Sequence, residues 1–237
     1  MLTYEELLET LKAHADKNYR DFNKKLLKNE NINVIGLRVP TLRKLAKEYR
    51  DELDTIMAFP DEYFEVTFLK CTAAGYLPFE KFLGYVDRLV PLLDNWATCD
   101  CFAAPCIKKN KEQFLPYIGK YFEDGREFVR RYALVTLLHY YVEEKYLPLI
   151  FEYLQKCEDE PYYVMMAAAW LLAEVLVKDY ERGVKFLEEG TLSRKINDKG
   201  IQKARESFRL SAEQKEALLK YKKGNFSKRV DKKGISG

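Results

Sequence analysis

The chain has 237 residues, of which 47% are hydrophobic and 32% are charged, with a net charge of +3. This composition is typical of a folded protein and excludes a chain that is disordered as a whole. No Gly-, Ser- or Pro-rich linker divides the sequence. It therefore predicts one domain over residues 1–223, followed by a basic tail over residues 224–237.

Membrane and metal-binding classes are also disfavoured. The first residues, MLTYEELLETLKAHADK, carry acids where a signal peptide has basic and then apolar residues, and no apolar run approaches the ~20 residues of a membrane span. Five cysteines without paired spacing indicate reduced thiols, and Cys99, Cys101 and Cys106 lack the spacing of zinc ligands. We expect a cytoplasmic monomer without metal or other cofactor.

Helical signals recur along the chain, and strand signals do not. Capping-box patterns begin at Thr3 and Ser211, and apolar residues in FEKFLGYVDRLVPLL recur at helical spacing. The sequence predicts helices at residues 3–17, 19–29, 40–56, 62–76, 79–93, 96–109, 112–122, 126–142, 145–157, 161–178, 180–189, 197–208 and 211–223. Their connections are short, so consecutive helices should be antiparallel.

A weak repeat relates two of these helices. Shifting VRRYALVTLL by 34 residues aligns it with YVMMAAAWLL, so that Ala133 matches Ala167 and two leucine pairs coincide. Helix pairs that repeat every ~30–45 residues are the signature of an α-solenoid. We therefore predict an all-α fold, a right-handed superhelix of HEAT-like helix pairs.

In such a solenoid alternate helices line one surface, so residues distant in sequence can share a concave face. Trp96 and Asp100, four residues apart in DNWATCDCF, should lie side by side on one helix. The other candidates for this face carry a positive charge or an indole, and they are Arg130, Arg131, Trp170, Lys199 and Lys203.

Positive charge is concentrated at the end of the chain. From Thr191 onward there are 14 Lys and Arg residues against 5 Asp and Glu, a net charge of +9, so the preceding residues carry −6. Such asymmetry favours a polyanionic partner such as nucleic acid, with a solvated basic tail as the alternative for residues 222–233. The residues expected to contact phosphates are Lys199, Lys203, Arg205 and Arg209.

These residues suit an anionic, ring-bearing ligand. Arginine binds phosphate through paired donors, an indole face favours cations, and a carboxylate stabilises developing positive charge. Each residue also has a purely structural alternative. Trp96 and Trp170 could fill helix interfaces, Asp100 could pair with a lysine, and Arg130 with Arg131 could be one exposed and one partly buried arginine.

Five segments resemble, in order and spacing, the AlkD-like family of DNA alkylation repair glycosylases. They are NVIGLRVPTLRKLAKE, NWATCD, REFVRRYALVTLL, YYVMMAAAWLLAE and NDKGIQKARESFR, and the similarity extends from about Ile35 to Arg209. No single motif is specific, but the ordered set is. The resemblance implies HEAT-like repeats that cradle duplex DNA and an enzyme that hydrolyses the N-glycosidic bond of cationic alkylpurines such as 3-methyladenine and 7-methylguanine.

The resemblance also assigns roles to individual residues. Trp96 and Trp170 match the two tryptophans that embrace the deoxyribose of the lesion, and Asp100 matches the catalytic carboxylate. Arg131 matches the arginine that contacts phosphate, and Arg130 is its neighbour if the alignment is shifted by one residue. The alternative function is a HEAT-like module that binds DNA or a protein partner without excising a base.

Overall fold

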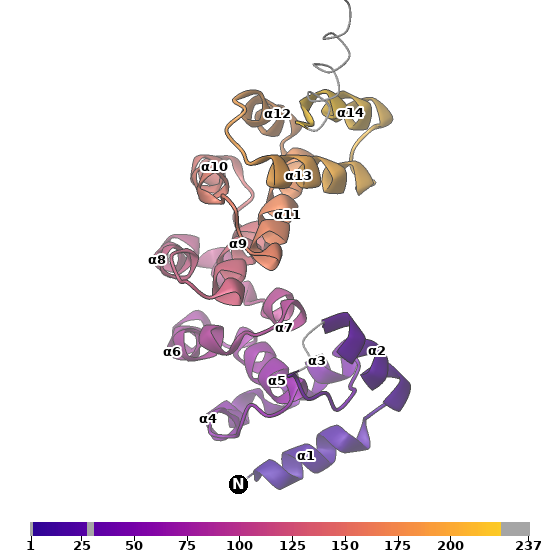
Figure 1. Cartoon of the computed structure of the whole chain (residues 1–237). Coiled ribbons are helices and arrows are strands. Elements are labelled where there is room, and N and C mark those ends of the chain that lie inside the picture. The colour runs from indigo at the N-terminus through magenta and orange to yellow at the C-terminus, as the bar shows by residue number, and fades with distance from the viewer. Residues whose placement is uncertain (1, 28–30, 224–237) are drawn as a thin grey trace, which may run out of the picture. The chain divides into compact units, whose positions relative to one another are not determined.

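The computed structural model describes residues 2–27 and 31–223 as α-helices joined by short connections and 3-10 turns (Figure 1). These residues form no β-strand, and one isolated bridge joins Asn33 to Tyr63. None of the described helices is long and apolar enough to cross a membrane. The all-α class is confirmed, whereas the predicted basic tail at residues 224–237 lies outside the described residues.

The chain divides into two compact units, Met1–Tyr117 and Ile118–Gly237, with the boundary inside α8 (Lys111–Phe122). The α-helices of the first unit before α8 are α1 (Tyr4–Ala13), α2 (Lys17–Leu27), α3 (Val39–Glu48), α4 (Leu53–Met57), α5 (Phe64–Gly75), α6 (Phe79–Leu89) and α7 (Trp96–Cys101). Those of the second unit after α8 are α9 (Glu127–Tyr140), α10 (Leu147–Lys156), α11 (Tyr162–Lys178), α12 (Tyr180–Glu188), α13 (Arg194–Glu206) and α14 (Ala212–Ala217).

The first unit is built around α5. Every residue of α5 is buried, and the helix packs against α3 and α7 on one side and against α4 and α6 on the other (Figure 1). Two charged residues of this helix are buried with the apolar ones, and each has partners. Glu65 accepts hydrogen bonds from backbone N–H groups, and the Lys70 ammonium donates to the Phe59 carbonyl oxygen at 2.7 Å and to Asp61 at 3.0 Å. Burial of these charges is possible because each is hydrogen-bonded.

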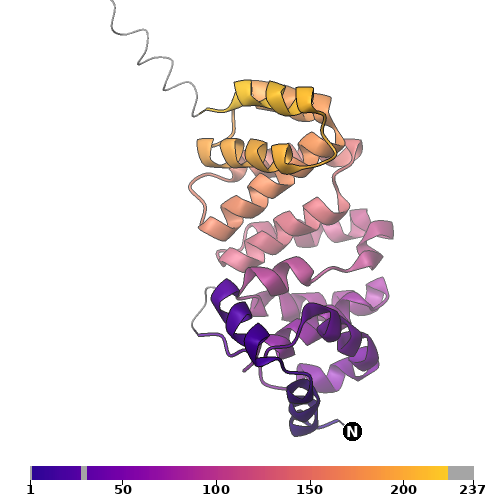
Figure 2. The same cartoon turned by 90° about the vertical axis from the view of Figure 1, so that its right-hand side faces the viewer.

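The second unit is built around α11. This helix packs against α9 and α13 in one layer, while α10 and α12 form a second layer beside it (Figures 1 and 2). Alternate helices therefore pack on one another within each unit, as expected for HEAT-like pairs. The two segments of the predicted repeat lie on α9 and α11. The prediction of an α-solenoid of HEAT-like helix pairs is confirmed, and the single domain remains a prediction.

Both predicted capping boxes form. The Thr3 hydroxyl accepts from the Glu6 N–H at 3.2 Å, and the Ser211 hydroxyl accepts from the Gln214 N–H at 3.2 Å. The N-cap of α13 was not predicted, and this helix begins at Arg194, after Ser193, rather than at residue 197. Short polar residues at these positions satisfy N–H groups that the helix itself leaves without acceptors.

Two long predicted helices are interrupted. The predicted helix at residues 96–109 is wrong in its second half, because α7 ends at Cys101 and a separate 3-10 helix spans Pro105–Lys109. Proline disfavours α-helical geometry in the residue before it, and Ala104 has φ −122° and ψ 92°. The predicted helix at residues 40–56 is likewise divided into α3, a 3-10 helix (Tyr49–Glu52) and α4.

The packing of α5 against the segment after α7 requires a glycine. A Cβ atom at Gly75 would lie 2.2 Å from the Ala103 carbonyl oxygen, whereas a Cβ atom at Gly84 on α6 would meet no atom within 4 Å. We expect Gly75→Ala to lower the free energy of unfolding by about 1–3 kcal/mol, the cost of overpacking. Gly84→Ala, the matched control, should raise it by about 0.5–1 kcal/mol. Urea denaturation measures both, and a stabilising Gly75→Ala would contradict this packing.

Candidate functional site

Helix α7 presents Trp96 and Asp100 as predicted, one turn apart on the same helix. The helix begins there because the Asn95 side chain accepts a hydrogen bond from the Thr98 N–H at 2.9 Å, which caps its first turn. Asn95 and Thr98 are buried, whereas Trp96 and Asp100 are each half-buried. The buried cap fixes α7, and the indole and the carboxylate both remain accessible to solvent.

The Trp96 indole also contacts α2. Its Nε1–H donates to the carbonyl oxygen of Leu26 at 3.4 Å, a long and therefore weak hydrogen bond. The polar edge of the indole thus faces the last turn of α2. Since the side chain is only half-buried, Trp96 is not a fully buried core residue, and part of its ring can meet a ligand.

The thiol of Cys101, next to Asp100, is held in its protonated form. Burial raises the pKa of Cys101, and the nearby Arg43 guanidinium, whose Nη2 lies 3.8 Å from Sγ, opposes that effect only in part. A raised pKa keeps the thiol protonated at neutral pH. No three His, Cys, Asp or Glu residues among the described residues are grouped so that they could hold a metal ion.

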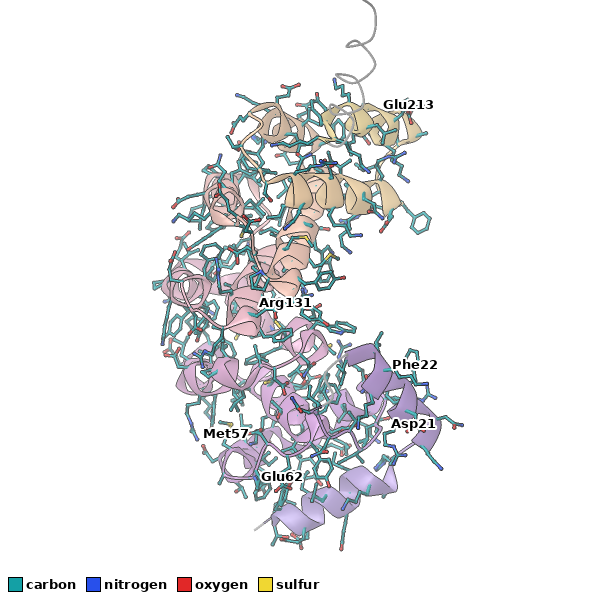
Figure 3. All side chains as sticks on the ribbon, viewed as in Figure 1. Asp21, Phe22, Met57, Glu62, Arg131 and Glu213 are labelled. Carbon is teal, nitrogen blue, oxygen red and sulfur yellow. The ribbon has the colours of Figure 1, made fainter. Side chains whose placement is uncertain are left out.

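In the second unit, Arg131 holds α9 against α11. Its guanidinium Nη1 donates to the carbonyl oxygen of Tyr163 at 2.7 Å, and the Tyr163 N–H donates to Glu127 of α9 at 2.8 Å. Arg131 lies on α9 (Figure 3) and is only 6% exposed. Arg131, which the resemblance matches to an arginine that contacts phosphate, therefore takes part in packing α9 against α11.

Arg130 points to a different partner. Its two terminal nitrogens donate to the two carboxylate oxygens of Glu160 at 2.7 and 2.8 Å, and its guanidinium lies 5.0 Å from the centre of the Phe122 ring. Glu160 is almost completely buried. A phosphate that bound Arg130 would have to displace a buried carboxylate, so this arginine is better suited to packing than to DNA contact.

Trp170 lies on α11 at a pocket of about 240 Å³. The indole is half-buried, and the ring of His139 meets it edge-on with the ring centres 6.4 Å apart. The pocket lies between α11 and the end of α13, and its lining is Trp170, Ala173, Glu174, Val177, Lys203, Glu206, Ser207 and Arg209. Two of the predicted phosphate-binding residues, Lys203 and Arg209, therefore lie in the same pocket as Trp170.

The four predicted phosphate-binding residues differ in their existing partners. Arg209 donates to both carboxylate oxygens of Glu174 at 3.0 and 2.6 Å, and this hydrogen bonding raises the pKa of the Arg209 guanidinium. Arg205 donates to the Lys215 carbonyl oxygen at 2.9 Å, and Lys199 to the Gln202 amide at 3.3 Å. The Lys203 ammonium has no hydrogen bond or ion pair to any of the described residues, which leaves its charge available for an anion.

Glu174 was not among the residues predicted for the site. It follows Trp170 by four residues on α11, the same spacing that separates Trp96 and Asp100 on α7. The segment AAAWLLAE contains this signal, because residues four apart share a helix face. The Glu174 carboxylate is bound by Arg209 and lies 3.7 Å from the Lys178 ammonium.

The position of Arg131 leads to a test of its two possible roles. Arg131→Ala removes a charged donor from the Tyr163 carbonyl, so the free energy of unfolding should fall by about 1.5–3 kcal/mol in urea denaturation. Arg126→Ala is the matched control, because Arg126 is an exposed arginine at the start of α9 that pairs with Asp124. Exposed ion pairs contribute at most about 1 kcal/mol.

The same variants should also be tested for lesion-DNA binding at a temperature where both are folded. A role in phosphate binding requires that Arg131→Ala weaken binding more than Arg126→Ala does. Equal affinities would assign Arg131 to helix packing alone.

The four residues with proposed roles at the lesion fall in two groups. Trp96 and Asp100 belong to the first unit, and Arg131 and Trp170 belong to the second. Within its unit, α7 brings the first two together, and Trp170 shares its pocket with Lys203. That all four line one face remains a prediction.

Comparison with known proteins identifies the family. A family model described as DNA alkylation repair enzyme matches residues 7–213, which is most of the chain and includes α7, α9, α11 and α13. No curated protein matches the chain. The match covers every segment on which the resemblance rests, and the helix-pair architecture agrees with it. The chain belongs to the DNA alkylation repair enzyme family.

Proposed function

We propose that the protein hydrolyses the N-glycosidic bond of cationic N3- or N7-alkylpurines, such as 3-methyladenine and 7-methylguanine, in duplex DNA. The observation that carries the proposal is the pair on α7, an indole and a carboxylate one helical turn apart and both accessible, in a member of a DNA alkylation repair family. The family implies that the substrate is DNA.

The proposed chemistry needs few groups. A cationic purine leaves with the electron pair of its glycosidic bond and becomes neutral, so no acid has to protonate it. The sugar that remains is an oxocarbenium-like cation, which the Asp100 carboxylate stabilises while it orients a water toward the anomeric carbon. The water oxygen bonds to that carbon, and the proton that the water loses passes to the solvent. The faces of Trp96 and Trp170 add favourable contacts with the same positive charge.

The second unit supplies contacts to the DNA backbone in this proposal. Lys203 is the best placed of the basic residues, because it has no partner among the described residues and lies beside Trp170. Contacts of this kind position the protein on the duplex without reading sequence. Arg131 supplies a further contact if its guanidinium can serve a phosphate while one nitrogen remains bound to the Tyr163 carbonyl.

A second candidate function is DNA binding without excision. One observation favours it: the guanidinium groups of Arg130, Arg205 and Arg209 already bind protein acceptors, which leaves fewer donors to hold the lesion in place. The two functions differ in their outcome. An enzyme releases a base from the duplex, whereas a binding protein leaves the duplex unchanged.

The test is incubation of the full chain with a duplex that carries 7-methylguanine, followed by measurement of free base and of bound duplex. The enzyme releases 7-methylguanine and leaves an abasic strand, and it releases no guanine from the undamaged duplex. Bound duplex from which no base is released would support the second candidate.

A further inference from the structure

Phe208 lies completely in solvent. Its exposure is 101% of that in an extended peptide, the highest among the large hydrophobic side chains that the structure describes as exposed. It lies in the short connection between α13 and α14. An exposed phenylalanine forgoes the hydrophobic stabilisation that burial would give it, and both faces of its ring are open to stacking on a planar partner such as a nucleobase.

The backbone that carries Phe208 is held on both sides. The Ser207 N–H donates to the Ala204 carbonyl oxygen at 3.1 Å, and the Arg209 N–H donates to the Ser207 hydroxyl at 3.2 Å. The Arg209 side chain is bound to Glu174, and Leu210 is buried. These contacts fix the backbone of the connection, so a partner need not order this segment when it binds.

The neighbours of Phe208 indicate the kind of partner. Ser207 and Arg209, on either side of it, line the pocket of Trp170, and Lys203 of the same pocket has no partner among the described residues. Among residues 118–223 the only other exposed large hydrophobic side chain is Tyr162. A protein-binding surface would present an apolar patch, whereas here one exposed aromatic residue stands between two residues that share a pocket with a lysine, and an aromatic ring with a nearby cation is the composition of a site for a nucleobase and its phosphate.

We propose that Phe208 stacks on a nucleobase that has lost its pairing, and that Lys203 holds an adjacent phosphate. This inference rests on the proposed function, because it takes the ligand to be DNA. Stacking on an aromatic ring tolerates any base, so the site would favour unpaired or distorted duplex over intact duplex without reading sequence. It would thereby direct the protein to sites where damage has weakened the helix.

The experiment uses the full chain and two duplexes of the same sequence, one fully paired and one with a single unpaired 2-aminopurine. Phe208→Leu removes the aromatic face and keeps an apolar side chain, and Phe208→Trp keeps the aromatic face. Tyr162→Leu is the matched control, since it removes another exposed aromatic ring from the same unit. Affinity and 2-aminopurine fluorescence are measured for every variant, and release of 7-methylguanine is measured separately.

The wild type should prefer the duplex with the unpaired base and should change its 2-aminopurine fluorescence on binding. Phe208→Leu should reduce this preference about tenfold and abolish the fluorescence change, while Phe208→Trp and Tyr162→Leu should retain both. An unchanged preference in Phe208→Leu, or equal losses in Tyr162→Leu, overturns the inference. If either of these results is obtained and the wild type nevertheless releases 7-methylguanine, the inference about Phe208 fails and the proposed function stands. A wild type that binds neither duplex and releases no base overturns the proposed function as well.

Discussion

Asp100→Asn is expected to slow the release of 7-methylguanine from duplex DNA by about 10²–10³-fold in single-turnover assays, the usual effect of removing one electrostatic stabiliser from a transition state. The amide that replaces the carboxylate has nearly the same shape, but it carries no charge to stabilise the oxocarbenium-like sugar. Because Asp100 is only half-buried on α7, the fold and the affinity for DNA should change little.

Asp94→Asn is the control for this variant. It makes the same chemical change just before α7, where Asp94 is exposed and accepts from the Asn95 amide at 2.8 Å. An asparagine keeps an acceptor there, so excision should remain near the wild-type rate. If Asp100→Asn excised at the wild-type rate, or if both variants were equally slow, Asp100 would not be the catalytic carboxylate.

Glu65→Ala is expected to have the largest effect on stability. The Glu65 side chain is completely buried, and its carboxylate accepts from the backbone N–H groups of Ile35 at 2.9 Å, Gly36 at 2.7 Å and Leu37 at 3.2 Å. A buried donor without an acceptor costs about 1–3 kcal/mol, so the free energy of unfolding should fall by roughly 3–5 kcal/mol. Gly36 has a φ of +109°, a backbone conformation that favours glycine. The three hydrogen bonds to Glu65 help to maintain this conformation.

Two further variants define the effect of Glu65. Glu65→Gln keeps one accepting oxygen for Gly36 and Leu37 but turns an amide N–H₂ toward the Ile35 N–H, so its loss of stability should be intermediate. Glu62→Gln changes an exposed acid close by, one that accepts from the Tyr4 hydroxyl, and should alter stability by less than about 0.5 kcal/mol. Urea unfolding measures all of them, and a Glu65→Ala midpoint equal to the wild-type midpoint would contradict this role.

The local features of the site could be predicted from sequence because they depend on short spacings. Trp96 and Asp100 share a face of α7 because they are four residues apart and because Asn95 starts the helix immediately before them. Helix periodicity and capping patterns likewise identified most helices. The end of α7 was predicted wrongly because apolar periodicity continues through Ala103 and Ala104, whereas Pro105 breaks the helix.

The long-range partners could not be predicted. Glu65 and Lys70 carry charges that are usually exposed, yet both are buried because donors and acceptors from other segments reach them. Arg130 and Arg131 are adjacent in sequence and bind separate groups about thirty residues away, Glu160 and the Tyr163 carbonyl. A basic residue identifies a potential phosphate contact, but its availability depends on tertiary partners that no local pattern specifies.

The most direct test of glycosylase activity is single-turnover release of base from a duplex that carries 7-methylguanine with a radioactive methyl group. We expect wild-type protein to convert the label to free 7-methylguanine, with one abasic site formed for each base released, and Asp100→Asn to do so far more slowly at equal binding. We expect no release of adenine or guanine from the same duplex, because neutral purines are poor leaving groups and the proposed mechanism has no acid to protonate them. Label that stays in the DNA at saturating wild-type protein would contradict the assignment of this chain as an alkylpurine glycosylase.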